Sequence, residues 1–391
     1  MASTRKRDRH GSSVASKSPS PSPPTSVAAT TLVLHQKRRR SVEVWNNFNF
    51  SSLPSPEWTL GPIIGRGQYG KVYRASCDDT RGAAKIIDTT EDDFHWLNDI
   101  RNEVCIMQRY SHPNVVKLYG AYKKALELKD HYQIWVVMEL CDGGSLGSLA
   151  KTVTSRGDRL SENVIGYIIH EVLQGLVYLH ENGVIHRDVK GSNILSTLSG
   201  NVKLADFGVA AKTMSHEVAR RRTSIVGTPH FMAPEVIYCE YQDDLDYDSR
   251  CDTWSLGITA LQLGDGVPPL TGKTNFEARR MIPRMKAPEF NKPDPWSSPL
   301  KGFVARCLTK DMDRRPFCKD LIEDAFVKIE NLSQAKAELA DLLGDLVSDP
   351  KSADTPDGSV RRKQPLNKAP SLPLVPEETT PSGDTVNAMF Y

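Results

Sequence analysis

An acid, a base and an amide lie close together in the segment VIHRDVKGSNILS, residues 184–196, with apolar residues on both sides. They are Asp188, Lys190 and Asn193. A buried carboxylate and ammonium are costly unless a charged group docks between them. A phosphoryl group fits this trio. Asp188 could orient a substrate hydroxyl and accept its proton, Lys190 could neutralise the transferring charge, and Asn193 could supply an oxygen to a metal ion.

A further acid follows in VKLADFG, where Asp206 lies thirteen residues after Asn193. Its carboxylate is expected to ligate a Mg²⁺ ion that bridges nucleotide phosphates. Taken alone, an Asp here is equally typical of a solvated loop, and DFG is a common turn tripeptide. The order HRDxKxxN, thirteen residues and then DFG is far more specific, and it predicts phosphoryl transfer from ATP.

A glycine-rich segment upstream matches the pattern GxGxxGxV. Glycine lets backbone N–H groups approach phosphate oxygens more closely than a Cβ allows. The pattern alone is also typical of a tight hairpin turn. A dinucleotide fold needs a helix straight after it, whereas the KVYRAS that follows is strand-like. The expected phosphate loop comprises Gly65, Arg66, Gly67, Gln68, Tyr69 and Gly70.

Lys85 lies fifteen residues after Gly70, within the apolar run AAKII. Glu103, in the next predicted helix, could reach it, and such an ion pair would hold the lysine against two phosphates. The alternative is an edge-strand lysine whose ammonium reaches water. Surface ion pairs are also common, so the pairing by itself leaves both interpretations open.

Sequence patterns predict the elements that must position these residues. Two strands joined by a glycine turn are predicted over 58–76, a third strand over 83–88, and a buried strand within 131–141. Helices are predicted over 93–110, over 251–264, and from a Ser161 cap to Asn182 and Gly183. Strands therefore dominate the first part of the ordered chain, and helices dominate after residue 144.

Composition and charge limit the function classes. Hydrophobic residues make up 39% and charged residues 25% of the 391 residues, as in an ordinary globular protein. Residues 1–50 carry +7, which leaves −5 for the rest of a chain whose net charge is +2. A basic arm on a mildly acidic body does not favour a specific nucleic-acid binder. Seven scattered cysteines without a CxxC pair, and no apolar run of membrane-spanning length, favour a cytoplasmic protein.

Four regions are expected along the chain. They are a disordered basic Ser/Pro-rich arm (1–57), an ordered body (58–330), an amphipathic helix (331–348) and a disordered tail (349–391). The helix carries Leu339, Leu342, Leu343 and Leu346 on one side, so it is expected to pack on the body or on a partner. The segments RKRDR and QKRRRS could be nuclear-import or anionic-lipid patches, or simply be solvated. The segment PSLPLVP could be a polyproline ligand, and the flanks could contact cytoskeletal or signalling partners.

With these motifs in order, residues 58–330 resemble a eukaryotic protein kinase. The resemblance implies an α+β, bilobal fold, with a small antiparallel β-sheet lobe over about 58–140 and a large helical lobe over about 141–330. It implies ATP and Mg²⁺ as cofactors and a protein as substrate. Lys190, two residues after the catalytic Asp188, and Thr228 in GTPHFMAPE resemble the serine/threonine-specific kinases.

The resemblance also implies the residues of the nucleotide site. Val72 and Ala83 would sandwich the adenine, with Leu195 beneath it. Met138 would be the gatekeeper, and Glu139 and Cys141 would form the hinge, although Cys141 is otherwise typical of a buried thiol. The full expected set is Ile64, Gly65, Arg66, Gly67, Gln68, Tyr69, Gly70, Val72, Ala83, Lys85, Met138, Glu139, Cys141, Ser145 and Leu195.

The same resemblance makes Asp206–Glu235 an activation segment. Ser224 has the spacing of the phosphorylation site in related kinases, and Thr223 is its neighbour. A phosphate there could pair with Arg187 and order the segment, the alternative being an unmodified basic loop. Three residues are expected to be structural: Glu235 and Arg315 as a buried ion pair, and Asp252 as a brace for the catalytic loop.

The motifs VKGSN, GTPxxMAPE and SLGITA resemble the sterile-twenty-like germinal-centre group of kinases. The segment CDTWSLGITALQLGDGVPPL is similar to the kinase half of the class III myosins. His230 and Phe231 replace the usual Phe-Trp, which alters the substrate-facing turn. No motor P-loop is present, so a kinase-only isoform, fragment or relative is expected, with cytoskeletal association as a further option. The rival interpretations are a pseudokinase scaffold and a motor-linked cytoskeletal enzyme.

Overall fold

The computed structural model describes residues 57–66, 70–90, 94–126, 131–212, 227–239, 246–292 and 295–348. The basic arm, except Glu57, and the C-terminal tail lie outside these ranges. All seven cysteines lie within them, and none forms a disulfide. None of the helices in these ranges combines the length and the apolar character that a membrane crossing needs.

The N-terminal lobe contains one antiparallel sheet of five strands in the order β1-β2-β3-β5-β4. The strands are β1 (Thr59–Arg66), β2 (Lys71–Cys77), β3 (Thr80–Thr90), β4 (Leu118–Ala125) and β5 (His131–Glu139). The strands expected over 58–76, over 83–88 and within 131–141 are confirmed. Strand β4 has no clear signal in the sequence, because LYGAYKKA contains no β-branched residue and its two tyrosines are outnumbered by Gly, Ala and Lys, which strands disfavour.

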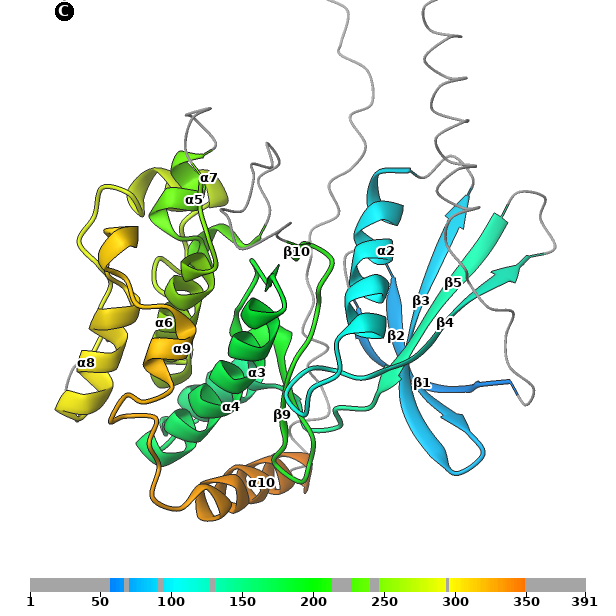
Figure 1. Cartoon of the computed structure of the whole chain (residues 1–391). Coiled ribbons are helices and arrows are strands. Elements are labelled where there is room, and N and C mark those ends of the chain that lie inside the picture. Colours follow the sequence, from blue (N-terminus) through cyan, green and yellow to red (C-terminus); the bar gives the residue numbers. More distant parts are fainter. Residues whose placement is uncertain are drawn as a thin grey trace, which may run out of the picture. The chain divides into compact units, whose positions relative to one another are not determined.

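One long helix, α2 (Phe94–Arg109), lies beside this sheet (Figure 1). Its buried residues Ile100, Val104 and Met107 share a hydrophobic core with Ile87 of β3 and Val136 of β5. Helix and sheet therefore hold each other in place, and the helix expected over 93–110 is confirmed.

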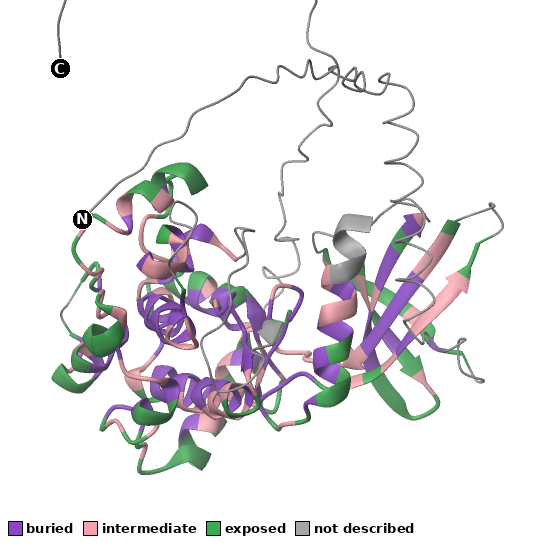
Figure 2. Ribbon diagram, turned by 45° about the horizontal axis from the view of Figure 1, so that its top comes forward, coloured by how far each residue is buried: buried purple, intermediate pink, exposed green. Residues whose placement is uncertain are grey.

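The C-terminal lobe is mostly helical. Its helices are α3 (Leu146–Ser155), α4 (Glu162–Glu181), α5 (Pro234–Tyr238), α6 (Arg250–Asp265), α7 (Asn275–Met281), α8 (Ser298–Cys307) and α9 (Cys318–Leu321). Helix α4 begins at its predicted cap, where Ser161 Oγ accepts a hydrogen bond from the backbone N–H of Val164. Figure 2 shows α4 and α6 largely buried, as expected of apolar helices at the centre of a helical lobe. The α+β kinase-like architecture is thus confirmed.

Short strands fix the loops of the C-terminal lobe. Strands β6 (Gly144–Ser145), β8 (Ile194–Ser196) and β9 (Val202–Leu204) form one small sheet, and β7 (Val184–Ile185) pairs with β10 (Ala211–Lys212). These pairings hold both ends of the 186–193 loop and of the 205–210 loop. The polar residues of both loops are therefore attached to fixed strands.

The expected amphipathic helix forms as α10 (Leu332–Ser348) and packs on α4. Ala335, Leu339 and Leu343 are buried, and Leu342 and Leu346 pack at the edge of the same core. Ser161 Oγ lies 2.5 Å from Glu338 Oε1, and Lys336 Nζ lies 2.6 Å from Asn201 Oδ1. The helix was expected to pack either on the body of the chain or on a partner, and in the structure it packs on the body.

Candidate active site

Lys85 on β3 and Glu103 on α2 form a buried ion pair. Lys85 Nζ lies 2.7 Å from Glu103 Oε2, with side chains 14% and 5% exposed. Burial opposes the charge of Lys85, but the carboxylates of Glu103 and Asp206 outweigh it and raise the pKa of the ammonium. Burial also raises the pKa of Glu103, so the nearby ammonium is what favours its ionised form. Glu103 therefore holds the Lys85 ammonium in a fixed position, where the carboxylate of Asp206 also acts on it.

Asp188 lies at the centre of a hydrogen-bonded cluster. Lys190 Nζ is 2.6 Å from both Asp188 Oδ2 and Thr228 Oγ1. The backbone N–H and the hydroxyl of Thr228 both donate to Asp188 Oδ1 at 2.9 Å. Asn193 Nδ2 donates to the backbone oxygen of Asp188 at 2.9 Å and to its Oδ2 at 3.0 Å. The sequence segments 188–193 and 227–228 are thereby joined around one carboxylate.

The Asp188 carboxylate is ionised at neutral pH. Burial alone would raise its pKa, but the charge and hydrogen bond of Lys190 and the hydroxyl of Thr228 lower it below the usual value. A carboxylate with a lowered pKa is a weak base. It is better suited to orienting a hydroxyl and taking its proton late in the reaction than to deprotonating it at the start.

Asn193 and Asp206, the two expected metal ligands, are linked through the backbone of Ala205. The backbone N–H of Ala205 donates to the carbonyl of Asn193 at 2.9 Å, so the residue before Asp206 is tied to Asn193. Asp206 is exposed and has a φ of 66°. Carboxylate and amide oxygens suit Mg²⁺. No group of three or more His, Cys, Asp and Glu in the described ranges could hold a metal alone, so a cation here needs further oxygens, such as those of phosphate or water.

The expected adenine-contacting residues lie on strands of two separate sheets. Val72 of β2 is opposite Lys85, and Ala83 of β3 is opposite Met138 of β5. Leu195 of β8 is opposite Ser145 of β6, and Gly65 of β1 is opposite Val72. Ile64 and Arg66 are exposed on β1, while Gly67, Gln68 and Tyr69 lie outside the described residues. The pairing therefore brings together residues that are far apart in the sequence.

Two expected nucleotide-site residues, Gly70 and Ser145, have structural roles of their own, and a third, Cys141, is unreactive. A Cβ at Gly70 would lie 2.1 Å from the carbonyl oxygen of Ile86, so glycine is needed there for strand packing alone. Ser145 Oγ caps α3 by accepting the N–H of Ser148 at 3.3 Å. Burial and the charge of Glu139 raise the pKa of the Cys141 thiol to about 12, so this cysteine is not a reactive thiolate at neutral pH.

Asp252 on α6 is hydrogen-bonded to the backbone directly before Asp188. It is fully buried, and its two oxygens accept the backbone N–H groups of His186 and Arg187 at 2.8 Å each. Arg187 has a φ of 67°, a conformation that costs about 1–3 kcal/mol for a non-glycine residue. Hydrogen bonds to Asp252 therefore hold a strained backbone directly before Asp188.

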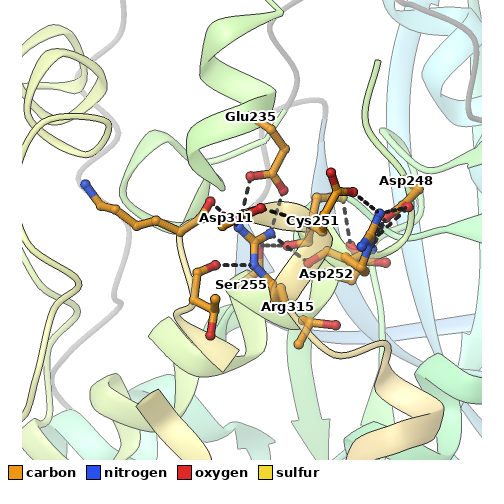
Figure 3. Close-up of polar contacts among 12 residues, drawn as sticks. Glu235, Asp248, Cys251, Asp252, Ser255, Asp311 and Arg315 are labelled. Carbon is orange, nitrogen blue, oxygen red and sulfur yellow. Dashed lines mark hydrogen bonds and ion pairs between the residues drawn. The ribbon is translucent and has the colours of Figure 1, made fainter. Parts of the chain in front are cut away.

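Arg315 and Glu235 form the second expected structural contact (Figure 3). Arg315 Nη1 and Nη2 lie 2.5 and 3.0 Å from the two oxygens of Glu235, a bidentate pair. Arg315 Nε donates to the carbonyl of Thr309, and its guanidinium lies over the ring of Trp254 at 5.1 Å. The Arg315 side chain is 0% exposed. This pair joins the segment after Thr228 to the 309–315 loop.

Two side chains of the site carry no sequence signal. Asn102 Nδ2 donates to the carbonyls of Phe207 and Ala210, which links α2 to the segment after Asp206. His180, at the end of α4, lies 2.8 Å from Asp252 Oδ2.

The expected phosphorylation sites Thr223 and Ser224 lie outside the described residues. Arg187 itself donates to the carbonyl of Val209 and to the hydroxyl of Tyr247.

His180 predicts a pH-dependent stability. Burial opposes its charge, but the neighbouring Cys318 and Asp252 favour it, and the pKa of His180 rises to about 10. Because this is above the unfolded value of about 6.5, the contribution is complete below pH 6.5 and is lost as the pH rises towards 10. Relative to His180→Gln, the wild type should be more stable by about 1–3 kcal/mol at pH 6, and by less at pH 9.

Urea unfolding of both proteins across this pH range measures the difference, in which titrations shared by the two proteins cancel. If the difference in unfolding free energy between the wild type and His180→Gln is the same at pH 6 and pH 9, the charge on His180 does not stabilise the fold through Asp252.

Comparisons with known proteins agree with this geometry. Residues 58–327 match the protein kinase domain model. Myosin-IIIa of Homo sapiens is 47% identical over 277 residues, which cover 70% of this chain and 17% of that protein. Serine/threonine-protein kinase mig-15 of Caenorhabditis elegans is 40% identical over 280 residues, covering 70% of this chain and 25% of that kinase. Serine/threonine-protein kinase dst1 of Dictyostelium discoideum is 40% identical over 305 residues, which cover 77% of this chain and 38% of that kinase.

Proposed function

The chain belongs to the protein kinase family, and from this premise we propose that it transfers the terminal phosphoryl group of ATP to serine and threonine hydroxyls of protein substrates. It spans about a fifth of the length of the myosin and mig-15 relatives, so motor activity is not part of this proposal. The observation that supports it most is the cluster in which Lys190 bridges Asp188 and Thr228 at 2.6 Å.

The substrate hydroxyl would bind beside Asp188. The carboxylate is held by Thr228 through Oδ1 and by Lys190 and Asn193 through Oδ2, so its position is fixed before substrate arrives. Asp188 would orient the hydroxyl and accept its proton as the new oxygen–phosphorus bond forms. Lys190 would balance the negative charge on the transferring group.

Members of this family use ATP with a divalent cation, and we propose Mg²⁺ as that cation. When bound, the cation neutralises charge on the nucleotide phosphates. Asp206 and Asn193 would hold it through their oxygens, because both are hard ligands tied together through Ala205. Lys85, positioned by Glu103, would bind phosphate oxygens.

We also propose how the protein is regulated, where in the cell it is located and which partners its flanks contact. Phosphorylation of Ser224 or Thr223 would order the activation segment by pairing with Arg187, which would then exchange its contacts to Val209 and Tyr247 for contacts to phosphate. The absence of disulfides among the seven cysteines supports a cytoplasmic protein. Likeness to the myosin relatives supports an association with the cytoskeleton, and the flanks would contact cytoskeletal or signalling partners.

The test is transfer of labelled phosphate from ATP to a panel of Ser- and Thr-containing peptides. Transfer should require a divalent cation, stop with EDTA and return with Mg²⁺. Lys85→Met should lower kcat/KM by about 10²-fold, because the phosphates lose a fixed positive charge. Removal of the Ser and Thr hydroxyls from the peptides is the control. If the wild type, with its activation segment phosphorylated, transfers no more phosphate than Lys85→Met, the protein is a pseudokinase scaffold.

A further inference from the structure

A groove lies along α7 and the turn that follows it in the C-terminal lobe. It has a volume of about 640 Å³ and is lined by Phe276, Glu277, Arg280, Met281, Arg284 and Met285. Phe276 is 59% exposed, more than any other large aromatic residue whose burial the structure describes. An aromatic ring and two methionines thus form an apolar surface that contacts solvent, which is a feature of docking surfaces.

The rim of this groove is basic. Residues 273–286 contain Lys273, Arg279, Arg280, Arg284 and Lys286 against the single acid Glu277. Glu277 is engaged at the start of α7, where it accepts the N–H and the hydroxyl of Thr274 at 2.7 and 2.8 Å.

Arg280 and Arg284, two arginines of the rim, are accessible to a charged ligand. Within the described part of the chain, neither Arg280 nor Arg284 has an ion-pair partner. The Arg280 guanidinium lies 5.6 Å from the centre of the Phe276 ring, and Arg284 Nη1 donates to the carbonyl of Arg280. Both side chains are exposed. One positive charge therefore lies near the aromatic ring and a second lines the same groove, and neither forms an ion pair with a carboxylate of the described residues.

The helix that carries the groove lies next to the segment that follows the Asp188–Thr228 cluster. Helix α7 packs on the short 3-10 helix η2 (Pro229–Phe231), which directly follows Thr228. His230 Nε2 lies 3.2 Å from the carbonyl of Lys273, just before α7. A polypeptide whose hydroxyl lies beside Asp188 and Thr228 could therefore continue over η2 onto α7.

We propose that the groove along α7 is a docking site for a second segment of the protein substrate, one that combines acidic side chains with an apolar anchor. The proposal rests on the kinase function proposed above. Acidic residues would pair with Arg280 and Arg284, and an apolar side chain would cover Phe276, Met281 and Met285. An exposed aromatic flanked by arginines is the composition that carries most of the energy in protein interfaces.

Two synthetic peptides test this assignment. Both contain one acceptor sequence that the wild type phosphorylates in the peptide panel, followed by a flexible linker and ten further residues. In the first, these residues alternate Asp or Glu with Leu or Phe; in the second, they are Gly and Ser only. For the wild type, the acidic–apolar peptide should have a KM about tenfold lower at equal kcat, because docking adds binding energy away from the reacting atoms.

The variant Arg280→Glu with Arg284→Glu should remove this tenfold advantage, and Phe276→Ala should remove most of it. Neither should change kcat or the KM of the Gly–Ser peptide, since all three side chains are exposed. Lys319→Glu with Lys328→Glu, on exposed positions elsewhere in the lobe, makes the same change in net charge and should keep the advantage.

Equal KM values for the two peptides on the wild type would overturn the proposal, and so would equal effects of the two charge-reversal pairs. If the isolated extension binds through Arg280 and Arg284 without lowering the KM, the groove serves a partner that is not the substrate, which also overturns it. Failure to phosphorylate any acceptor peptide would instead reject the kinase function.

Discussion

Asp188→Asn is expected to lower kcat by about 10²–10⁴-fold while leaving nucleotide affinity largely unchanged. The amide has nearly the same shape, but it cannot accept a proton from the substrate hydroxyl. It also removes the negative charge that holds Lys190 at 2.6 Å, so the ammonium is no longer fixed between Asp188 and Thr228. The effect should appear in kcat rather than in nucleotide binding, because Lys85 and Glu103 belong to a separate ion pair.

Steady-state phosphorylation of one peptide gives kcat, and titration with ATP gives nucleotide affinity. Asp345→Asn, an exposed change of the same kind on α10, is the matched control and should behave as the wild type. Wild-type turnover by Asp188→Asn would show that this carboxylate does not orient or deprotonate the hydroxyl.

Arg315→Ala is expected to lower the free energy of unfolding by about 3–5 kcal/mol. The change leaves the Glu235 carboxylate, mostly buried, without its bidentate partner, and it removes a hydrogen bond to the carbonyl of Thr309. It also removes the guanidinium from the face of Trp254. An unpaired buried charge costs far more than a surface pair gains, so the loss should be large although only one side chain is altered.

The neighbouring Arg314 supplies the control. Its side chain is 83% exposed and pairs with Asp311 at 3.3 Å, so Arg314→Ala should cost about 0–1 kcal/mol. Urea unfolding of both variants gives the comparison. The double variant Glu235→Gln with Arg315→Met should recover part of the loss, since no uncompensated charge remains. Equal unfolding free energies for Arg315→Ala and Arg314→Ala would contradict a structural role for the pair.

Local signals in the sequence were enough to predict most of the fold. The strands around the glycine turn and the helix after Ser161 have strong periodicity and clear end signals, and they form at the expected places. Strand β4 lacks such signals, and its edge position is set by pairing with β5. The amphipathic pattern of α10 predicts a buried face but not its contacts, which depend on residues such as Ser161, far away in sequence.

The candidate site was predictable where its residues occur in short motifs. Asp188, Lys190 and Asn193 lie within six residues, and Asp206 follows at a characteristic spacing. Asn102 and His180 lie on helices whose patterns reflect packing alone, and their partners come from other elements. Gly70 does fall in a sequence motif, the phosphate-loop pattern, but that motif does not indicate that glycine is also needed there to pack against Ile86. Only the folded arrangement reveals these roles.

The central claim is that Lys85, Asp188, Asn193 and Asp206 converge on one metal-bound nucleotide. A crystal structure with Mg²⁺ and a non-hydrolysable ATP analogue tests it most directly. We expect the ion about 2.0–2.1 Å from a carboxylate oxygen of Asp206 and from Asn193 Oδ1. Lys85 Nζ should lie about 2.7–2.9 Å from a phosphate oxygen, and Asp188 should face the terminal phosphate. A nucleotide bound elsewhere, or a metal ion that contacts neither Asp206 nor Asn193, would contradict the account.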